Sequence, residues 1–348
     1  MRISLIVPAP FDLVSGGYGY DRRIVERLRS SGHTVDVVAL DGAFPMVDEA
    51  GRSAARTAWM ELAHDAIPVI DGLALPGFAG MEVALAARNA VGLIHHPLSL
   101  ETGLADADRV WLDAAERASF RHLTRFITTS ETTANTLAAG FGVAAARITV
   151  IVPGTDDAAR CMGSRGGLGG GSCEILSIGT LIPRKGHDVL LRALARLFDL
   201  DWRLTIVGSP ERDVACARAL VTLVRDLAIG DRVHFAGELV GEALDAAWRR
   251  ADLFALATRY EGYGMVIAEA LKRGLPVVVT KGGAAGALVT PETGCACPVD
   301  DSDQVSKSLR RLIFGVDLRR DLADAAWRSG QNLPSWSAQA ALFAESLG

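Results

Sequence analysis

Short apolar runs rich in β-branched residues recur along the whole chain, and most are followed by a stretch whose apolar residues have helical spacing. The runs stand at Ile3–Val7, Thr34–Leu40, Ile67–Ile70, Val91–Ile94, Phe126–Thr129 and Ile148–Val152, and then at Glu174–Ile178, Leu204–Val207, Val233–Phe235, Leu253–Leu256, Pro276–Thr280 and Gly294–Pro298. Such runs, ended by glycine, proline or polar residues, are typical of parallel strands buried on both faces. The pattern therefore predicts an α/β fold in which strands and helices alternate.

A glycine-rich segment divides these runs into two series. It is Ser164–Ser172, with the sequence SRGGLGGGS, and its composition is typical of a flexible linker. A chain of 348 residues also exceeds the size at which one hydrophobic core keeps growing. We therefore expect two α/β domains, residues 1–160 and 173–332, joined by a linker at 161–172.

The amino-acid composition limits the kinds of molecule that the chain is expected to bind. Hydrophobic residues make up 49% of the chain and charged residues 22%, and the net charge of -5 gives no general attraction to nucleic acid. The five cysteines, an odd number, form neither a CxxC pair nor a metal-binding pattern with histidine, which favours a reduced, cytoplasmic protein. No signal peptide and no membrane-spanning run is evident, so any membrane contact is expected to be peripheral, on the inner face.

A glycine loop is predicted between the first strand and the following helix, and it contains Gly16, Gly17 and Gly19. Its spacing matches neither the dinucleotide fingerprint nor the P-loop. Its position, beyond the carboxyl end of a strand, is nevertheless where open α/β sheets bind ligands. The polar and aromatic residues around it are Tyr18, Tyr20, Asp21, Arg22 and Arg23. Either they line a pocket, or the aspartate only starts a helix and the arginines are solvated.

His95 and His96 follow the predicted strand Val91–Ile94 and precede Pro97. Proline disfavours helix at the residue before it, so the pair lies where strand becomes loop. Neighbouring residues at a strand end point to opposite sides, so at most one of them faces a given cleft. One histidine is a candidate functional residue, with a structural or solvated pair as the alternative.

A helix predicted over Val110–Arg125 carries Arg117, Arg121, His122 and Arg125 late in its length. A basic helix face can bind anionic lipid. Cations near a helix C-terminus are also common on an ordinary solvated face. The helix is therefore a candidate membrane contact, with a solvated face as the alternative.

In the second half, Gly179 ends a predicted strand, and Arg184 and Lys185 come just before the next predicted helix. A guanidinium fork, an ammonium and a helix N-terminus all favour negative charge. These residues form a candidate diphosphate site, and an exposed basic pair is the alternative.

The stretch Thr258–Thr280 places Glu261 in a glycine loop and Glu269 eight residues later. On one continuous helix this spacing would turn the two carboxylates roughly 80° apart. We therefore place Glu261 in the loop and Glu269 in the following helix, both near the mouth of a cleft. Two solvated glutamates on an ordinary α/β unit are the alternative.

Taken together, these segments resemble the glycosyltransferases of family 4, which have the GT-B fold. The segments are GTLIPRKGHDVLLRAL at 179–194, LTIVGS at 204–209, VHFAGEL at 233–239, ADLFALATRYEGYGMVIAEALKRGLPVVVT at 251–280 and TGCACPVDD at 293–301. GGYGYDRRIVERLRSSGHTVDVV at 16–38 resembles the N-terminal segment of the family. The resemblance covers essentially the whole chain and is more specific in the second half. One departure is Ala284-Ala285-Gly286, where the family often has an acidic residue.

The resemblance implies two Rossmann-like domains facing across a cleft, with a terminal helix at 333–348 that crosses back to the first domain. It places the nucleotide sugar mainly on the second domain and the acceptor mainly on the first. The implied donor-binding residues are Gly16, Gly17, Gly179, Thr180, Arg184, Lys185, Gly208, Glu238, Leu239, Glu261, Gly262, Tyr263, Gly264, Met265 and Glu269. The implied catalytic residues are Arg184, Lys185, Glu261 and His95, with His96 less favoured.

The implied roles differ between these residues. The two cations would stabilise the diphosphate, and Glu269 would bond the ribose hydroxyls. Glu261 and the backbone of Gly262–Met265 would hold the sugar and phosphates, and Glu238 and Leu239 would meet the base. His95 would face the donor sugar.

The resemblance therefore predicts a retaining, metal-independent hexosyltransferase that uses an NDP-sugar, with a UDP-sugar favoured, as its co-substrate and needs no cofactor. No cluster of carboxylates suited to Mg²⁺ stands out along the sequence. The expected acceptor is a membrane glycerolipid such as diacylglycerol, a polysaccharide precursor or a small molecule. The alternatives are an epimerase or phosphorylase of the same architecture, or a non-catalytic sugar-nucleotide-binding protein. A dehydrogenase is disfavoured because the dinucleotide fingerprint is missing.

Overall fold

The computed structural model describes residues 1–101, 103–163 and 171–348. The chain forms two compact units, one made of residues 1–154 with 334–348 and the other of residues 155–333. Most of the glycine-rich segment that we predicted as the linker, residues 164–170, lies outside the described residues.

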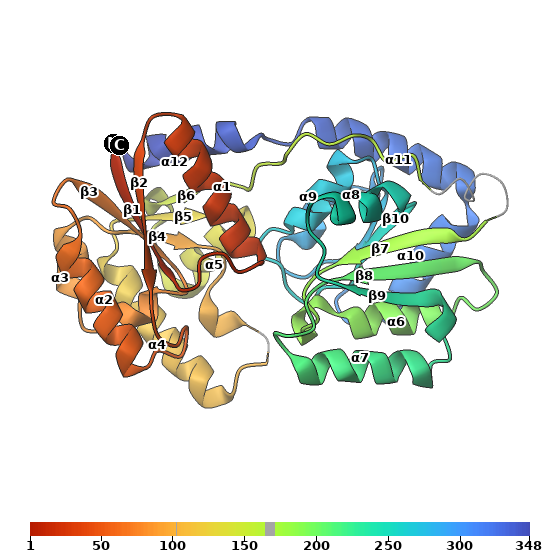
Figure 1. The fold of residues 1–348 in the computed structure, drawn as a ribbon, viewed down its shortest axis with the longest axis horizontal. Coiled ribbons are helices and arrows are strands. Elements are labelled where there is room, and N and C mark those ends of the chain that lie inside the picture. Colours follow the sequence, from red (N-terminus) through yellow and green to blue (C-terminus); the bar gives the residue numbers. More distant parts are fainter. Residues whose placement is uncertain (102, 164–170) are drawn as a thin grey trace. The chain divides into compact units, whose positions relative to one another are not determined.

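The first unit is built on a parallel six-stranded sheet with helices packed around it (Figure 1). Its strands lie in the order β2-β1-β3-β4-β5-β6. They are β1 (Arg2–Pro8), β2 (Thr34–Leu40), β3 (Ala66–Asp71), β4 (Val91–Ile94), β5 (Arg125–Thr128) and β6 (Ile148–Val150). The helices are α1 (Gly16–Ser30), α2 (Glu49–Glu61), α3 (Glu82–Ala87), α4 (Asp106–His122), α5 (Glu131–Phe141) and α12 (Trp336–Leu347). Every strand pair is parallel, so all the strands end at one edge of the sheet.

The second unit repeats this architecture with a sheet of order β12-β11-β10-β7-β8-β9. The strands are β7 (Cys173–Ile178), β8 (Trp202–Val207), β9 (Val233–Gly237), β10 (Leu253–Leu256), β11 (Val277–Thr280) and β12 (Gly294–Cys297). The helices are α6 (His187–Ala195), α7 (Val214–Asp226), α8 (Gly241–Arg250), α9 (Met265–Lys272), α10 (Ser302–Phe314) and α11 (Val316–Gln331). In β10 and β11 every residue is buried, which explains their uninterrupted apolar sequence. The predicted α/β fold class with parallel sheets is confirmed.

Two local predictions are wrong. The segment with Gly16 and Gly17 is not a loop, because α1 already begins at Gly16, where the Ser15 hydroxyl caps the helix by accepting the Tyr18 N–H. The predicted basic helix also ends earlier than expected, since α4 stops at His122. Arg125 therefore lies in β5 and not on a helix face.

The C-terminal helix α12 belongs to the first unit and packs against α1 (Figure 1). Its residues Trp336 and Phe343 are buried, and the Trp336 ring lies edge-on to Tyr20 with 5.9 Å between ring centroids. Arg125 donates to the carbonyl of Ser346 at 2.6 Å. The chain enters this helix so close to Gly154 that a Cβ on that glycine would lie 2.4 Å from the Trp336 nitrogen. The helix is thus an integral part of this core.

We expect Phe343→Ala to destabilise the first unit by about 3–5 kcal/mol, because it removes a buried aromatic side chain from a packed interface. Hydrogen exchange of the β1 amides in increasing urea measures this loss within the unit concerned. Leu342→Ala is the matched control, since Leu342 is 46% exposed on the same helix and should change stability by less than about 0.5 kcal/mol. Equal effects of the two substitutions would contradict the packing of α12 described here.

Candidate functional site

The second unit brings Arg184, Lys185 and Glu261 together at the carboxyl edge of its sheet. The two cations stand in a short 3-10 turn, Pro183–Lys185, between β7 and α6, and Glu261 follows β10. Lys185 Nζ lies 2.6 Å from Glu261 Oε1, and Arg184 Nη1 lies 3.8 Å from the same oxygen. The three side chains are only 9–18% exposed. The sequence pattern places Glu261 in a different segment from the two cations, and the fold joins all three into one ion-paired cluster.

The cluster contains two cationic side chains and one carboxylate. Burial alone would raise the pKa of Glu261, but the charges of Lys185 and Arg184 and the hydrogen bonds to it lower that pKa instead. The Thr258 hydroxyl adds one of these bonds, donating to Oε1 at 3.0 Å. Two cations therefore share one ionised carboxylate, and the contacts within the cluster leave one positive charge in excess. A partly buried positive charge at the end of parallel strands can bind an anionic ligand.

The backbone fixes the two loops of this cluster against each other. Gly186 has φ of +62°, and a Cβ there would lie 1.9 Å from the Ala257 carbonyl oxygen, so only glycine permits this approach. The Arg259 N–H donates to the Arg184 carbonyl at 2.7 Å. The Arg184 side chain in turn donates to the Tyr260 carbonyl at 2.7 Å. The charged side chains are therefore held by loops that are themselves bonded together.

The loop after Glu261 leads directly into α9. Gly264 precedes the helix with φ of +100° and contributes no side-chain cap, and Met265 is its first residue. Glu269 lies in α9 and is partly exposed, whereas Tyr263 is buried. The Glu261 backbone also pairs with the loop after β11, since its carbonyl accepts from the Ala284 N–H at 2.8 Å. The predicted arrangement of a loop carboxylate followed by a helix carboxylate is confirmed.

The other predicted donor residues lie at neighbouring strand ends. Gly179 and Thr180 follow β7, Gly208 follows β8, and Glu238 and Leu239 follow β9. A Cβ on Gly208 would lie 2.0 Å from the Gly179 carbonyl oxygen, so these two loops touch through their backbones. Leu239 lines a cavity of about 180 Å³ that lies beside β7, β8 and β9 and under α8. These positions surround the same sheet edge as the ion-paired cluster.

The first unit places the two histidines in different surroundings. His96 Nε2 lies 2.9 Å from Glu101, whereas His95 Nε2 lies 3.1 Å from Asp21 and 3.4 Å from Asp71. Gly17 is not part of a loop, but it still approaches the site, since a Cβ on it would lie 3.3 Å from the His95 ring.

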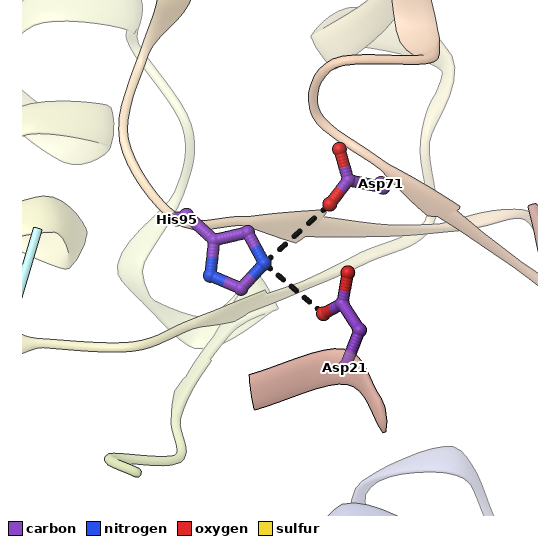
Figure 2. Close-up of side chains that lie close together, drawn as sticks. All are labelled: Asp21, Asp71 and His95. Carbon is purple, nitrogen blue, oxygen red and sulfur yellow. Dashed lines mark hydrogen bonds and ion pairs between the residues drawn. The ribbon is translucent and has the colours of Figure 1, made fainter. Parts of the chain in front are cut away.

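Figure 2 shows that the Asp21 and Asp71 carboxylates converge on one nitrogen of the His95 ring. Burial raises the pKa of Asp21 to about 7, although the charge of His95 opposes that rise. Burial alone would lower the pKa of His95, but the charge of Asp21 and the hydrogen bonds to both aspartates raise it to about 10.

The trio also offers one ligand atom per residue within a span of 4.8 Å, a spacing that could accommodate a metal ion. The direct contacts of the trio are those of a hydrogen-bonded ion pair, and we interpret it so.

Sequence reasoning missed Asp71 and Thr258, and it left Asp21 undecided. Asp71 is the last residue of β3, directly after a buried apolar run, and this position is the signal that could have identified it. The trio itself comes from three separate segments, α1, β3 and the residue after β4, so only the sheet order brings it together.

The structure weakens the prediction that the helix at Val110–Arg125 contacts a membrane, because Arg117 and Arg125 are engaged in other contacts. Arg117 on α4 pairs with Asp113 at 2.7 Å and lies over the Phe141 ring, 4.8 Å from its centroid. Arg125 is bonded to the end of α12 instead of projecting from α4. Among the described residues, no helix is long and apolar enough to cross a membrane.

Comparison with known families identifies both halves of the chain. Residues 20–159 match the model described as Glycosyltransferase Family 4, and residues 172–314 match the model described as Glycosyl transferases group 1. The two matched ranges together cover most of the chain.

Two kinds of curated relative are similar to parts of this chain. A D-inositol 3-phosphate glycosyltransferase of Corynebacterium diphtheriae is 32% identical over 168 residues, which are 47% of this chain and 39% of that protein. An MMP alpha-(1->4)-mannosyltransferase of Mycolicibacterium hassiacum is 26% identical over 277 residues, 75% of this chain and 65% of that protein. The chain therefore spans less than two thirds of the length of these relatives.

Solved structures share the whole fold. A sucrose-phosphate synthase from Thermosynechococcus elongatus has a TM-score of 0.83 at 20% identity, covering 99% of this chain and 97% of that one. Anabaena Alr3699/HepE, solved in complex with UDP and glucose, has a TM-score of 0.78 at 19% identity and covers 100% of this chain and 99% of that one. These similarities confirm the GT-B fold class.

The buried ion pair of Glu261 leads to a pH-dependent prediction. Because the folded state lowers the pKa of Glu261, its charge stabilises the fold above the ordinary value of 4.5, and this stability is lost as pH falls through the folded pKa. Glu261→Gln should therefore cost about 3 kcal/mol at pH 7, and the difference from wild type should narrow only below pH 4.5. Urea unfolding over a pH series measures both.

Glu242→Gln is the matched control for this substitution. Glu242 also pairs with an arginine of the second unit, but its side chain is 81% exposed, so its pair should contribute less than about 1 kcal/mol. A loss at Glu261 as small as that at Glu242, or a loss that does not change with pH, would be inconsistent with the buried pair.

Proposed function

Because the chain belongs to the family 4 glycosyltransferases, which have the GT-B fold, we propose that it transfers a hexose-type sugar from a nucleoside diphosphate sugar to an acceptor hydroxyl. The observation that carries this proposal is the cluster of Arg184, Lys185 and Glu261 at the carboxyl edge of the second sheet. It offers excess positive charge where the leaving diphosphate would bind.

The chemistry of the transfer explains why such a cluster is useful. Breaking the bond between a sugar and a diphosphate develops negative charge on the leaving oxygen. Cations and backbone N–H groups that are already in place stabilise this charge without reorganising. Lys185 and Arg184 are held in place by Glu261 and by the two bonded loops, so this part of the site is preorganised. The transfer we propose is metal-independent and retains the anomeric configuration.

We assign the rest of the donor to the same edge. Glu269, one turn into α9, would accept hydrogen bonds from the ribose, and the residues that follow β9, Glu238 and Leu239, would meet the base. The backbone from Gly262 to Met265 would contact the sugar and phosphates. A UDP-sugar is the favoured donor, and the structural similarity to HepE, which was solved with UDP-glucose, supports this choice.

The acceptor we favour is a small polar molecule with a free hydroxyl group. A curated relative is named for D-inositol 3-phosphate, a small polar molecule, which supports such an acceptor. A membrane glycerolipid is less supported, because Arg117 is paired and Arg125 is not on α4.

A transfer assay tests this function. The chain is incubated with UDP-, GDP- and ADP-sugars and a panel of polyols, sugars and diacylglycerol vesicles, and both the released nucleotide and the mass of the product are measured. We expect nucleotide release that depends on the acceptor, with one hexose added to it. Sugar conversion without any acceptor would instead indicate an epimerase, and donor binding without turnover across the panel would indicate a binding protein.

The ribose role of Glu269 gives a residue-level prediction. Glu269→Ala should weaken donor binding by about 1.5–3 kcal/mol, roughly 10- to 150-fold in Kd, because it removes a charged hydrogen-bond acceptor. Isothermal titration with the donor nucleotide measures the change. Glu345→Ala, at an exposed position of α12, is the control and should leave Kd unaltered. Unchanged affinity in the Glu269 variant would remove that residue from the site.

A further inference from the structure

The His95 ring is held on several sides by the first unit. Its backbone carbonyl, just after β4, accepts hydrogen bonds from the hydroxyls of Thr133 at 3.1 Å and Thr129 at 3.5 Å. Its ring packs against Gly17, and it lies edge-on to Tyr20 with 5.4 Å between centroids. The ring therefore has little freedom to turn, although 18% of the side chain is exposed.

Two buried carboxylates face the single imidazole of His95. Asp21 and Asp71 are 0% and 1% exposed, and in the part of the chain that the structure describes His95 is the only cationic side chain that pairs with either of them. Among the described residues, none forms a hydrogen bond with Asp21 Oδ2, and Asp21 borders a small apolar cavity. Asp71 Oδ1, in contrast, accepts the Leu73 N–H at 2.6 Å. A neutral His95 would leave a buried carboxylate charge without any compensating cation, which is costly.

Tyr20, a further titratable group against the ring, does not supply a charge. Tyr20 comes from α1 with Asp21, and burial raises its pKa well above the ordinary value, so it stays neutral. Its hydroxyl donates to the Ile151 carbonyl at 3.1 Å. The contacts from α1 and β3 therefore comprise two acids, which favour a proton on the imidazole, and a neutral phenol, which adds no charge.

From this geometry we propose that Asp21 and Asp71 are positioning residues that keep His95 as an imidazolium, with its Nδ1–H available to a substrate oxygen. Both carboxylates bind Nε2, so the second ring nitrogen points away from them (Figure 2). Because the trio as a whole carries no excess positive charge, the group it suits is a neutral hydroxyl oxygen of a sugar and not a phosphate. The role in substrate recognition rests on the proposed glycosyl transfer, whereas the charge state of the ring does not.

The charge state can be measured on the full chain without any substrate. Histidine is labelled with ¹⁵N, the protein is treated with EDTA, and the His95 signals are assigned by their loss in His95→Gln. We expect both ring nitrogens of His95 to stay protonated from pH 6 to pH 8.5. In Asp21→Asn the deprotonation midpoint should move down toward the ordinary value of 6.5. A wild-type ring that titrates near 6.5, or whose protonation responds to a divalent ion added after the EDTA, would overturn the proposal.

A pH–rate profile tests the role in transfer. If His95 in Asp21→Asn returns to its ordinary pKa, only about 1% of it is protonated at pH 8.5, so kcat should fall by up to about 100-fold relative to wild type there and far less at pH 5.5. Asp71→Asn should show the same trend. Asp36→Asn is the control, an aspartate of β2 that is 45% exposed and paired with Arg2.

Measurements of UDP binding and of turnover together show whether a negative result concerns the positioning role of Asp21 or the proposed function. UDP affinity should be the same in wild type and Asp21→Asn, because UDP is assigned to the second unit. A loss of kcat that is equal at all pH values would show that Asp21 is merely structural and would overturn the positioning role. Absence of any turnover in wild type would instead reject the proposed function and leave the NMR result standing.

Discussion

The buried carboxylate of Glu261 is the interaction on which the candidate donor site depends. It accepts from Lys185 at 2.6 Å and from Thr258 at 3.0 Å, and it faces Arg184 at 3.8 Å. These contacts join the loop that leaves β7 to the loop that leaves β10, two neighbouring strands of the sheet. Without this carboxylate, the two cations would repel each other in a poorly hydrated place. With it, the two cations are fixed side by side, and cations that are already in place are what stabilises a diphosphate.

The trio of the first unit, Asp21, Asp71 and His95, has the opposite ratio of acidic to basic groups. There, two buried carboxylates share one imidazole, whereas in the second unit two cations share one carboxylate. Both trios lie where parallel strands end, the edge at which open α/β sheets bind ligands. The opposite balance fits the roles we propose, in which the second unit would bind an anion and the first would not. This agrees with a nucleoside diphosphate on one unit and hydroxyl groups on the other.

The sequence predicts most of the strands because parallel strands are buried on both faces and therefore read as apolar runs, as in β10 and β11. It also predicts Arg184, Lys185 and Glu261 as candidates, since each follows a strand in a glycine-bearing loop. It does not predict that they pair, nor the trio around His95, because residues far apart in sequence meet only through the sheet order. The sequence does not show where α1 begins, because three glycines favour a loop, whereas the Ser15 cap and the packing of Tyr20 and Asp21 favour a helix. The pattern predicts Arg125 on a helix because it does not show that α4 ends before Leu123.

Hydrogen–deuterium exchange of the full chain with and without saturating UDP tests the central assignment most directly. We expect UDP to slow exchange most strongly at residues 179–186 and 258–269, which comprise the two loops that meet at Glu261 and the start of α9. Protection confined to β1, α1 and the loop after β4, with residues 179–186 and 258–269 unchanged, would contradict it.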